Sequence, residues 1–126
     1  MSNHEVGVDW VFNIDDLAQG ICRKLSDGIE TRIFTGQNAM LSVVRLKPHS
    51  SGQVHSHLEE QWGILIKGEC TRIQGGEEIE MFAGDFWYTP SNVSHGIRTG
   101  DSSATVIDIF SPPRDAYRTS GEGFDR

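Results

Sequence analysis

The sequence predicts an all-β fold in which one small domain forms a closed sandwich or barrel. Short runs of β-prone residues recur from about residue 21 to residue 110, separated by turn pairs such as Asp27-Gly28 and Gly75-Gly76. No stretch sustains the three- and four-residue apolar spacing of a core helix. The 126 residues leave room for one domain and not for two.

Ten strands are expected, each ended by turn-forming residues. Before them, Ile14–Ile21 could form a short helix with Asn13 or Asp15 as its cap. The domain core then covers about residues 21–114, between an N-terminal arm (1–20) and a loose Gly- and Ser-containing tail (118–126). The expected strands are Ile21–Leu25, Ile29–Phe34, Ala39–Lys47, Gln53–His57, Gln61–Lys67, Cys70–Gln74, Glu77–Phe82, Phe86–Thr89, Val93–Arg98 and Ala104–Phe110.

Composition narrows the environment and the partners. With 37% hydrophobic and 23% charged residues, the chain has the balance of a soluble globular protein. The net charge of −7 argues against nucleic acid or an anionic membrane as a partner, because both attract basic surfaces. The N-terminus lacks the pattern of a secretion signal, and two cysteines do not make a disulfide framework. We therefore expect a reduced, cytoplasmic protein that touches neither nucleic acid nor membrane.

Histidines carry the first sign of chemistry. His55 and His57 are two residues apart, so on a strand both imidazoles point to one face and can reach one metal ion. His95, after a Pro90-Ser91-Asn92 turn, can supply a third nitrogen from a neighbouring strand. Glu59, Glu60 and Gln61 each offer an oxygen. Three imidazoles and one oxygen leave positions open on a divalent ion, as catalytic sites do.

Other histidines and the cysteines fit plainer roles. His4 falls in the N-terminal arm, and His49 follows Pro48 in what should be a surface turn. Trp62, Trp87 and Tyr88 could stack on a sugar ring, although aromatic residues on strands are usually core. Cys22 and Cys70 are expected to be buried fillers.

The last expected strand contains an acidic residue in apolar surroundings. Both faces of Ala104–Phe110 are otherwise apolar, so Asp108 should be buried, at a cost of several kcal/mol unless it is paired. Either an arginine or backbone N–H groups hold it, or it is a general acid/base beside the metal. Arg114 follows two prolines, which hold it on a stiff extended segment. It is either a solvated arginine or a grip for a substrate carboxylate.

Two stretches resemble the sequence motifs of the cupin family. The first runs from His55 to Gly68: H-x-H, an oxygen donor, six residues and glycine. The second runs from Gly84 through Pro90 to His95, after the short gap of compact single-domain cupins. Three positions depart from the motifs without removing a ligand: His49 and Asn92 stand in place of glycines, and Thr99 in place of an asparagine. The resemblance implies a double-stranded β-helix, an antiparallel jelly-roll barrel with the metal inside.

Three blocks narrow this resemblance to the pectin-degradation cupins of KdgF type, which convert 4,5-unsaturated uronates to the linear keto-uronate. The blocks are His55–Gln61, Pro90–Gly96 and Asp108–Arg114. The resemblance implies four metal ligands, His55, His57, Gln61 and His95. It also implies an acid/base or water-positioning role for Asp108, a pocket-shaping role for Phe110 and a carboxylate-binding role for Arg114. The spacing from Gly68 favours Gln61 as the oxygen ligand, whereas charge favours Glu59 or Glu60.

We therefore expect a metal-dependent isomerase or lyase-type cupin acting on a small carboxylated sugar or keto acid, with a 4,5-unsaturated uronate as the first candidate. An Fe(II)-dependent dioxygenase or small-molecule lyase is one alternative, and a non-catalytic metal- or ligand-binding cupin is another. Zn, Ni, Mn and Fe all suit the donors. A neutral glutamine ligand favours isomerisation, hydration or elimination over oxygen activation. Strands that are apolar on both faces suggest a homodimer.

Overall fold

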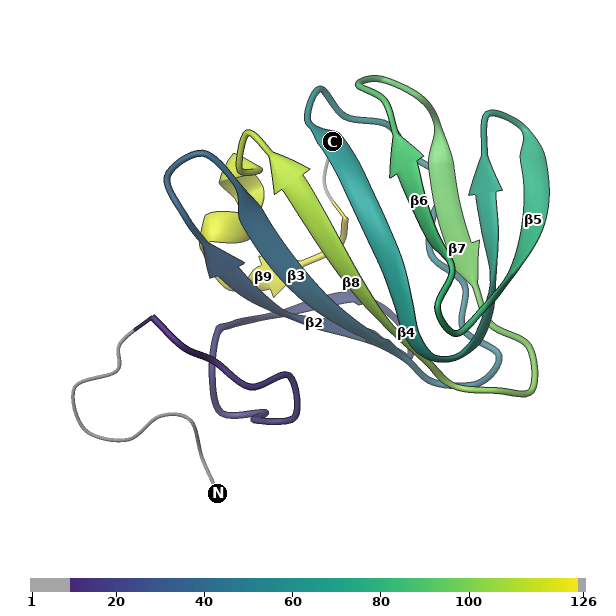
Figure 1. Cartoon of the computed structure of the whole chain (residues 1–126), viewed down its shortest axis with the longest axis horizontal. Coiled ribbons are helices and arrows are strands. Elements are labelled where there is room, and N and C mark those ends of the chain that lie inside the picture. Colours follow the sequence, from purple (N-terminus) through teal and green to yellow (C-terminus); the bar gives the residue numbers. More distant parts are fainter. Residues whose placement is uncertain (1–9, 125–126) are drawn as a thin grey trace.

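The structure, a computed structural model, describes residues 10–124 and is built almost entirely of strands (Figure 1). His4 and the start of the N-terminal arm lie outside the described residues. The elements in chain order are β1 (Ile21–Ser26), β2 (Ile29–Thr35), β3 (Met40–Leu46), β4 (Glu60–Gln74), β5 (Glu77–Phe82), β6 (Phe86–Thr89), β7 (His95–Arg98), β8 (Ala104–Ser111), the 3-10 helix η1 (Asp115–Arg118) and β9 (Gly121–Glu122). This is the expected all-β architecture, and its pairing is antiparallel except between β1 and β9.

Strand β4 joins the two layers of the fold. Its first part pairs with β8 and β6, and its last part, from Glu69 to Gln74, pairs with β5 and β7. Gly68 stands at the change of partners with a φ of 84°. A Cβ there would lie 1.8 Å from the Ser103 carbonyl oxygen, so this position requires glycine. Figure 1 shows the result, with β2, β3, β8 and the first part of β4 side by side and β5 and β7 across from them.

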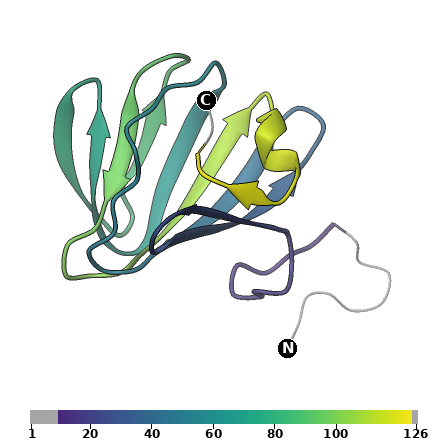
Figure 2. The same ribbon diagram turned by 180° about the vertical axis from the view of Figure 1, so that it is seen from behind.

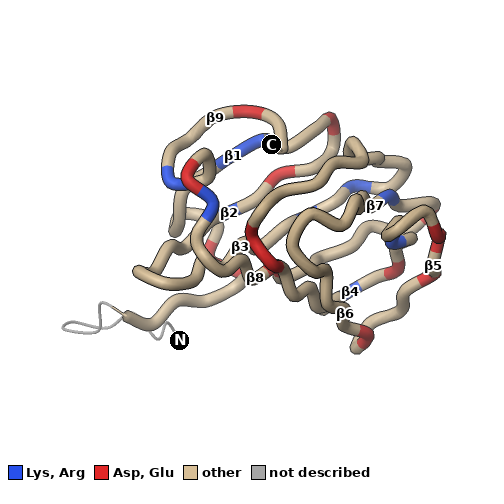
Figure 3. Tube along the Cα trace, turned by 90° about the horizontal axis from the view of Figure 1, so that it is seen from above, with Lys and Arg blue, Asp and Glu red and all other residues tan. Residues whose placement is uncertain are grey.

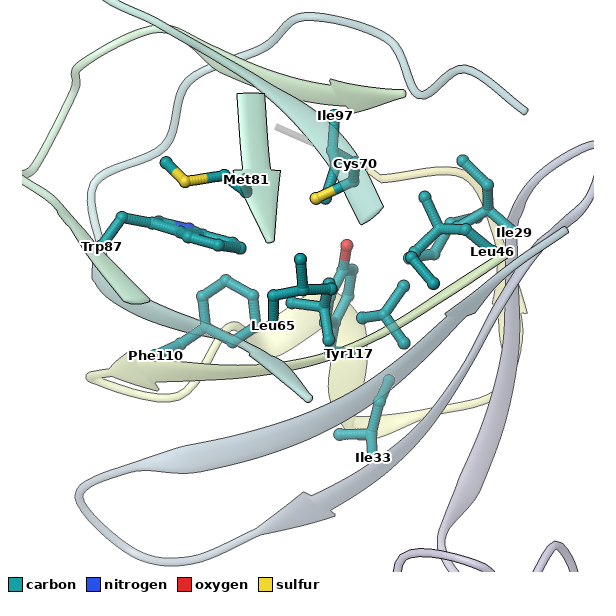
Figure 4. Close-up of a cluster of buried hydrophobic side chains, with 14 of the residues drawn as sticks. Ile29, Ile33, Leu46, Leu65, Cys70, Met81, Trp87, Ile97, Phe110 and Tyr117 are labelled. Carbon is teal, nitrogen blue, oxygen red and sulfur yellow. The ribbon is translucent and has the colours of Figure 1, made fainter. Parts of the chain in front are cut away.

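Inward-facing side chains fill the space between the layers. Residues on β3 and β8 alternate in the register that pairs Met40 with Phe110 and Val44 with Val106, so these apolar side chains point inward together. Figure 4 shows Leu65, Trp87, Phe110 and Tyr117 pointing into the same interior. The apolar core occupies much of the barrel, and the polar site described below lies beside it.

Several expected elements differ from the structure. The stretch 53–57 forms a single bridge, His55 with His95, because its two reciprocal backbone hydrogen bonds do not continue into a ladder. Residues 14–20 form turns and bends instead of a helix, with Asn13 Oδ1 accepting a hydrogen bond from the Asp15 N–H. The two strands expected over 61–67 and 70–74 are one strand, β4, because Gly68 bends the ladder without ending it.

The C-terminal tail was expected to be loose, but its described part is docked. After β8, η1 and the short β9 turn back toward β1, where β9 pairs in parallel through Arg23 and Lys24 (Figure 2). Composition predicted a loose segment because it is rich in glycine and polar residues. The contacts that hold it come from β1, almost a hundred residues earlier in the chain.

Surface charge is mixed. Figure 3 shows Lys and Arg interspersed with Asp and Glu along the trace. Within residues 10–124, no helix is long and apolar enough to cross a membrane.

Candidate metal centre

Three histidines from two separate segments meet inside the barrel. His55 and His57 lie in the extended segment between β3 and β4, and His95 begins β7. The His55 and His95 backbones exchange hydrogen bonds of 2.9 and 2.8 Å, which brings the segments together. One ring nitrogen from each histidine lies within 4.8 Å of those of the other two, and all three residues are buried. The predicted convergence of His95 on the H-x-H pair is therefore present.

Each imidazole is oriented by a nearby backbone carbonyl. The Nδ1 atoms of His55, His57 and His95 lie 2.8, 2.9 and 2.9 Å from the carbonyl oxygens of Gln53, Glu59 and Val93. A carbonyl oxygen can only accept, so each Nδ1 carries the proton and donates. The three Nε2 atoms then keep their lone pairs, which is the tautomer a metal ligand needs.

Gln61, the second residue of β4, brings an oxygen to the same place. Its side chain is 3% exposed, and its Oε1 lies 3.1 Å from His57 Nε2. Because His57 already donates through Nδ1, two acceptor atoms face each other here, and a cation between them would satisfy both. Three imidazole nitrogens and one amide oxygen, buried and converging, therefore fit a divalent metal ion.

The alternative oxygen donors lie elsewhere. Glu60 is exposed, and its Oε1 accepts a hydrogen bond of 2.7 Å from the Tyr88 hydroxyl on the outer face. Glu59 lies behind His57, with its Oε1 3.5 Å from His57 Nδ1 and 3.9 Å from Arg114 Nε. Of the three candidates, Gln61 has the position that the spacing from Gly68 favours.

Burial keeps the imidazoles uncharged. Loss of water lowers the pKa of His55 to about 4 and that of His95 to about 3, and it also lowers the pKa of His57. The positive charges of Arg114 and Arg72 act in the same direction. Neutral imidazoles are ready to bind a cation without first releasing a proton.

Asp108 lies on β8 between β3 and β4, opposite Ser42 and Gly63, on the inner face. Its Oδ1 is buried and has no hydrogen-bond partner among the described residues. Burial raises the pKa of this carboxyl, while Arg72, a hydrogen bond from Gln61 and Arg114 lower it. The sequence left two interpretations of Asp108, a carboxyl held by an arginine or a general acid/base beside the metal. Both are compatible with this position, because Arg72 and Arg114 are near and the carboxyl lines the same cavity as His55 and His95.

Arg114 is buried, against the alternative of a solvated arginine, and only 4% of it is exposed. Its guanidinium carbon lies 4.3 Å from the centre of the Tyr117 ring and 5.6 Å from the Phe110 ring. Phe110, at the end of β8, also stands edge-on to the His57 ring at 5.6 Å. The structure brings Asp108, Phe110 and Arg114 to the cavity that His55, Gln61 and His95 line.

Among the lining residues that the sequence analysis did not predict, an arginine and two aromatic residues bear on the chemistry of this cavity. Arg72, on β4, is 3% exposed and donates to Thr89 Oγ1 at 2.8 Å. Tyr117 of η1 and Phe124 of the tail also line the cavity. An arginine two residues after Cys70, on a strand whose other inward residues are uncharged, is a signal that could have found Arg72. Nothing local marks Tyr117 or Phe124.

The remaining candidates take other places. Trp62 and Tyr88 contact each other on the outer face with ring centres 4.9 Å apart and planes tilted by 41°, while Trp87 lies in the core. His49 is exposed, with its Nε2 3.1 Å from Asp101 Oδ1. Cys70 is buried as expected. The expectation for Cys22 was wrong, because it is exposed on β1 and its sulfur accepts a hydrogen bond from Arg32.

The three departures from the cupin motifs have structural explanations. His49 and Asn92 take the place of glycines and adopt left-handed backbone, with φ of 56° and 67°. Asparagine tolerates this conformation well, and the Asn92 N–H donates to the His57 carbonyl at 2.8 Å. Thr99 Oγ1 accepts from the Ser50 N–H at 3.0 Å and donates to the Lys47 carbonyl at 2.6 Å. Asn92 therefore ties its turn to the His57 segment, and Thr99 ties the end of β7 to the turn at residues 47–50.

Comparison with known proteins agrees with this geometry. Residues 42–110, more than half of the chain, match the family described as "Cupin domain". The chain belongs to the cupin family. This cupin is 28% identical over 93 residues to the pectin degradation protein KdgF of Dickeya dadantii, a match that covers 72% of the chain and 84% of that protein.

Two further relatives match this cupin over different shares of their own length. The structure of KdgF from Halomonas sp. superposes with a TM-score of 0.70 at 27% identity, covering 75% of this cupin and 88% of that chain. Oxalate decarboxylase OxdC of Bacillus subtilis is 31% identical over 72 residues, which are 53% of this cupin and 19% of that enzyme. This cupin is thus similar to KdgF over most of both chains and to oxalate decarboxylase over one part of it.

Proposed function

We propose that this cupin is a metal-dependent enzyme that converts a 4,5-unsaturated uronate to its linear keto form. The observation that carries the proposal is one cavity lined both by the converging donors His55, Gln61 and His95 and by Asp108 and Arg114. The similarity to KdgF over most of the chain supports the choice of substrate. A cation site beside an acid and a guanidinium suits a small carboxylated substrate.

The reaction is an isomerisation and needs no oxidant. A proton leaves the anomeric hydroxyl as the ring opens, and a proton is added at C4 as the double bond becomes the keto form. In the proposal Asp108 accepts and delivers these protons, and Arg114 holds the substrate carboxylate through parallel hydrogen bonds. Phe110 packs against the sugar and excludes water. The bound metal would supply a Lewis acid that polarises a substrate oxygen.

The donor set supports this chemistry over oxygen activation. Three neutral imidazoles and one amide leave the full charge of a divalent ion uncompensated, which makes it a stronger Lewis acid. The familiar iron oxygenase face uses two histidines and one carboxylate. Zn, Ni, Mn and Fe each suit the donors of this site.

The direct test mixes the metal-loaded protein with 4,5-unsaturated galacturonate and follows the ultraviolet absorbance of the conjugated double bond. We expect the absorbance to fall with turnover, and the metal-free protein to act no faster than buffer. Stoichiometric binding without loss of absorbance would instead indicate a non-catalytic binding cupin. Iron-dependent oxygen consumption would indicate a dioxygenase.

The variant Asp108→Asn tests the acid/base assignment. The amide has the same shape and removes a buried charge, so the fold and the metal should remain. Turnover should fall by about 10²–10⁴-fold, the usual contribution of a positioned acid or base. Metal content and melting temperature serve as controls. Full activity in a metal-loaded variant would contradict the role.

Two further expectations belong to the proposal. Cys22 and Cys70 are free thiols, which supports a reducing compartment such as the cytoplasm. Part of the outer face of β3, β8 and β4 is apolar, with Leu41, Ile107 and Ile109 beside a groove of about 540 Å³, which supports a homodimer.

A further inference from the structure

The cavity at the histidines is too small for a sugar acid in this structure. Its volume is about 30 Å³. A single water needs about 10–15 Å³, and sites for small organic ligands measure about 300–1,000 Å³. There is space for an ion with one or two waters. Some part of the wall must move before any larger ligand reaches the imidazoles.

Most of the wall cannot move without breaking the sheet. Strands β3, β4 and β8, which carry Ser42, Gln61, Arg72 and Asp108, are each paired on both sides. Arg114, Tyr117 and Phe124 lie outside any ladder, but Arg114 and Tyr117 are almost fully buried, whereas Phe124 is half-buried and follows the two-residue strand β9. Phe124 is therefore the least buried of the three wall residues outside the sheet.

Phe124 lies directly over the cavity. Its ring centre is 4.9 Å from the centre of the His55 ring, at an interplanar angle of 37°. The ring also lies against Gly52, where an added Cβ would come within 2.7 Å of it. Gly52 therefore gives the ring a place close to the imidazole, and a larger residue would displace it.

The segment 119–124, which we name the closing segment, is held at few points. Residues 119–122 are exposed. The pairing of β9 with β1 involves two residue pairs, and Gly123 N–H donates to the Lys24 carbonyl at 2.8 Å. Arg23 adds hydrogen bonds, since its guanidinium donates to the carbonyls of Gly123 and Glu122 at 2.8 and 2.9 Å and to that of Ala116 in η1 at 2.9 Å, and Phe124 packs against the core.

Arg23 therefore links β1 to the closing segment and to η1. It is 6% exposed, and its guanidinium carbon lies 5.0 Å from the centre of the Tyr117 ring. One side chain therefore binds both η1 and the closing segment to β1. The partners of Arg23 are backbone carbonyls, and water can replace the hydrogen bonds that release of the segment breaks.

We propose that the closing segment is a movable wall of the metal centre and that Phe124 determines which ligands reach the imidazoles. With the segment in place, the site admits an ion and water. With it displaced, the His55 side of the cavity opens to a sugar-sized acid. When the segment returns, the Phe124 ring contacts the bound molecule and selects for one with an apolar or planar face.

The test measures access and uses no substrate, so its failure is distinct from failure of the proposed activity. Co²⁺-loaded protein is mixed with increasing concentrations of the chelator EDTA, and loss of the visible Co²⁺ absorbance is timed. The quantity compared is the slope of the rate against EDTA concentration, because the slope reports entry of the chelator. Phe124→Ala and Arg23→Lys are compared with wild type and with Phe82→Ala, which removes an exposed ring of β5.

Phe124→Ala should raise the slope about tenfold, since losing a packed ring shifts the population toward the open state by that order. Arg23→Lys keeps the charge but not the three-carbonyl geometry, and it should raise the slope in the same direction. Phe82→Ala should match wild type. Equal slopes for Phe124→Ala and wild type, zero included, would overturn the proposal.

Arg23→Lys distinguishes movement of the closing segment from simple blockage of the path by the Phe124 ring. A faster slope in Phe124→Ala with no change in Arg23→Lys would overturn the movement, because the ring alone would then fill the path. Equal initial Co²⁺ content in all four proteins is expected, because neither Phe124 nor Arg23 offers a ligand atom. The melting temperature of each variant is measured together with its Co²⁺ content, as a control for folding.

Discussion

At the scale of single residues, the donor atoms of the metal centre are aimed by their own neighbours in the chain. Each imidazole donates to a carbonyl two residues away, at Gln53, Glu59 or Val93. The ring orientation is therefore set by contacts within a short segment of the chain. What the barrel adds is the meeting of the segments, through the reciprocal bridge of His55 and His95.

The variant His95→Ala should lose the metal. It removes one of three nitrogen donors and leaves a gap that water fills, so affinity should fall more than about 100-fold, beyond the loss from an outer-shell change. Metal content after purification, measured by atomic spectroscopy, checks this. His49→Ala is the matched control, because His49 is exposed and pairs with Asp101. Unchanged metal content in folded His95→Ala would remove this histidine from the site.

The two cysteines should differ in reactivity. Burial raises the pKa of the Cys70 thiol to about 11, so about a thousandth of it is thiolate at pH 8. Cys22 is exposed on β1. Iodoacetamide at pH 8 should therefore label Cys22 and leave Cys70 until the protein unfolds, as peptide mass spectrometry would show. Native labelling of Cys70 at the rate of Cys22 would contradict its burial.

The site residues that could be predicted from the sequence are those marked by neighbouring residues in the chain. The H-x-H pair and the spacing of Gln61 from Gly68 point to the donors, and apolar neighbours mark Asp108 as buried. Arg72 was missed because an arginine on a strand is usually exposed, and its partners Thr89 and Gln74 are identified only by the fold. The sequence shows the type of each side chain and which residues of a strand share a face. It does not show which strands face each other across the interior.

At the scale of elements, β4 explains most of the difference between expected and observed strands. Glycine predicted a break after Lys67, yet Gly68 turns the strand at a φ of 84° while its pairing with Ala104 continues. The bend gives one strand two sets of partners. It also places Gln61 and Arg72, eleven residues apart, on the same cavity.

Gly68→Ala should destabilise the protein strongly. Its added methyl group would meet the Ser103 carbonyl, and its backbone would stay left-handed. The free energy of unfolding should fall by about 3 kcal/mol or more, measured by urea denaturation. Gly84→Ala is the control, because its φ is 100° but nothing lies within 4 Å of the added carbon, so it should cost about 1–2 kcal/mol. Equal losses would show that conformation alone, without the close approach, requires glycine at Gly68.

The tail shows the limit of composition as a guide to elements. Polar and glycine residues over 118–126 predicted a loose segment, and the exposed side chains of 119–122 do little to hold it. Its backbone carbonyls are bound by Arg23, whose role is invisible until β1 and η1 lie together. Backbone acceptors carry no sequence signature, so docking of this kind cannot be read from residue types.

At the scale of the whole molecule, the negative net charge of the chain contrasts with the positive charges buried at the site. The net charge of −7 repels an anionic substrate at long range. Attraction must come from close by, where Arg72 and Arg114 are buried beside the donors and a metal would add positive charge. Lys and Arg are interspersed with Asp and Glu along the trace (Figure 3), so in the proposed function the buried Arg72 and Arg114 would be the local charges that attract an acid.

The apolar outer face gives the last prediction. Trp62, Tyr88, Ile107 and Ile109 lie on the outside of β4, β6 and β8, and Trp62 and Tyr88 are 45% and 40% exposed. Such a face is buried against a second copy in the proposed homodimer, because exposed apolar patches of this kind mark interaction surfaces. Sedimentation should give twice the chain mass of 14.0 kDa for wild type.

Ile109→Glu should shift this equilibrium to the single chain, since a carboxylate would be buried against an apolar partner surface. Ile79→Glu, at an exposed position of β5 in the other layer, should remain dimeric. Because the cavity lies on the inner face of β8, dissociation should leave metal content unchanged. A wild-type protein that sediments as a single chain at high concentration would contradict the dimer, and the apolar face would then need another partner.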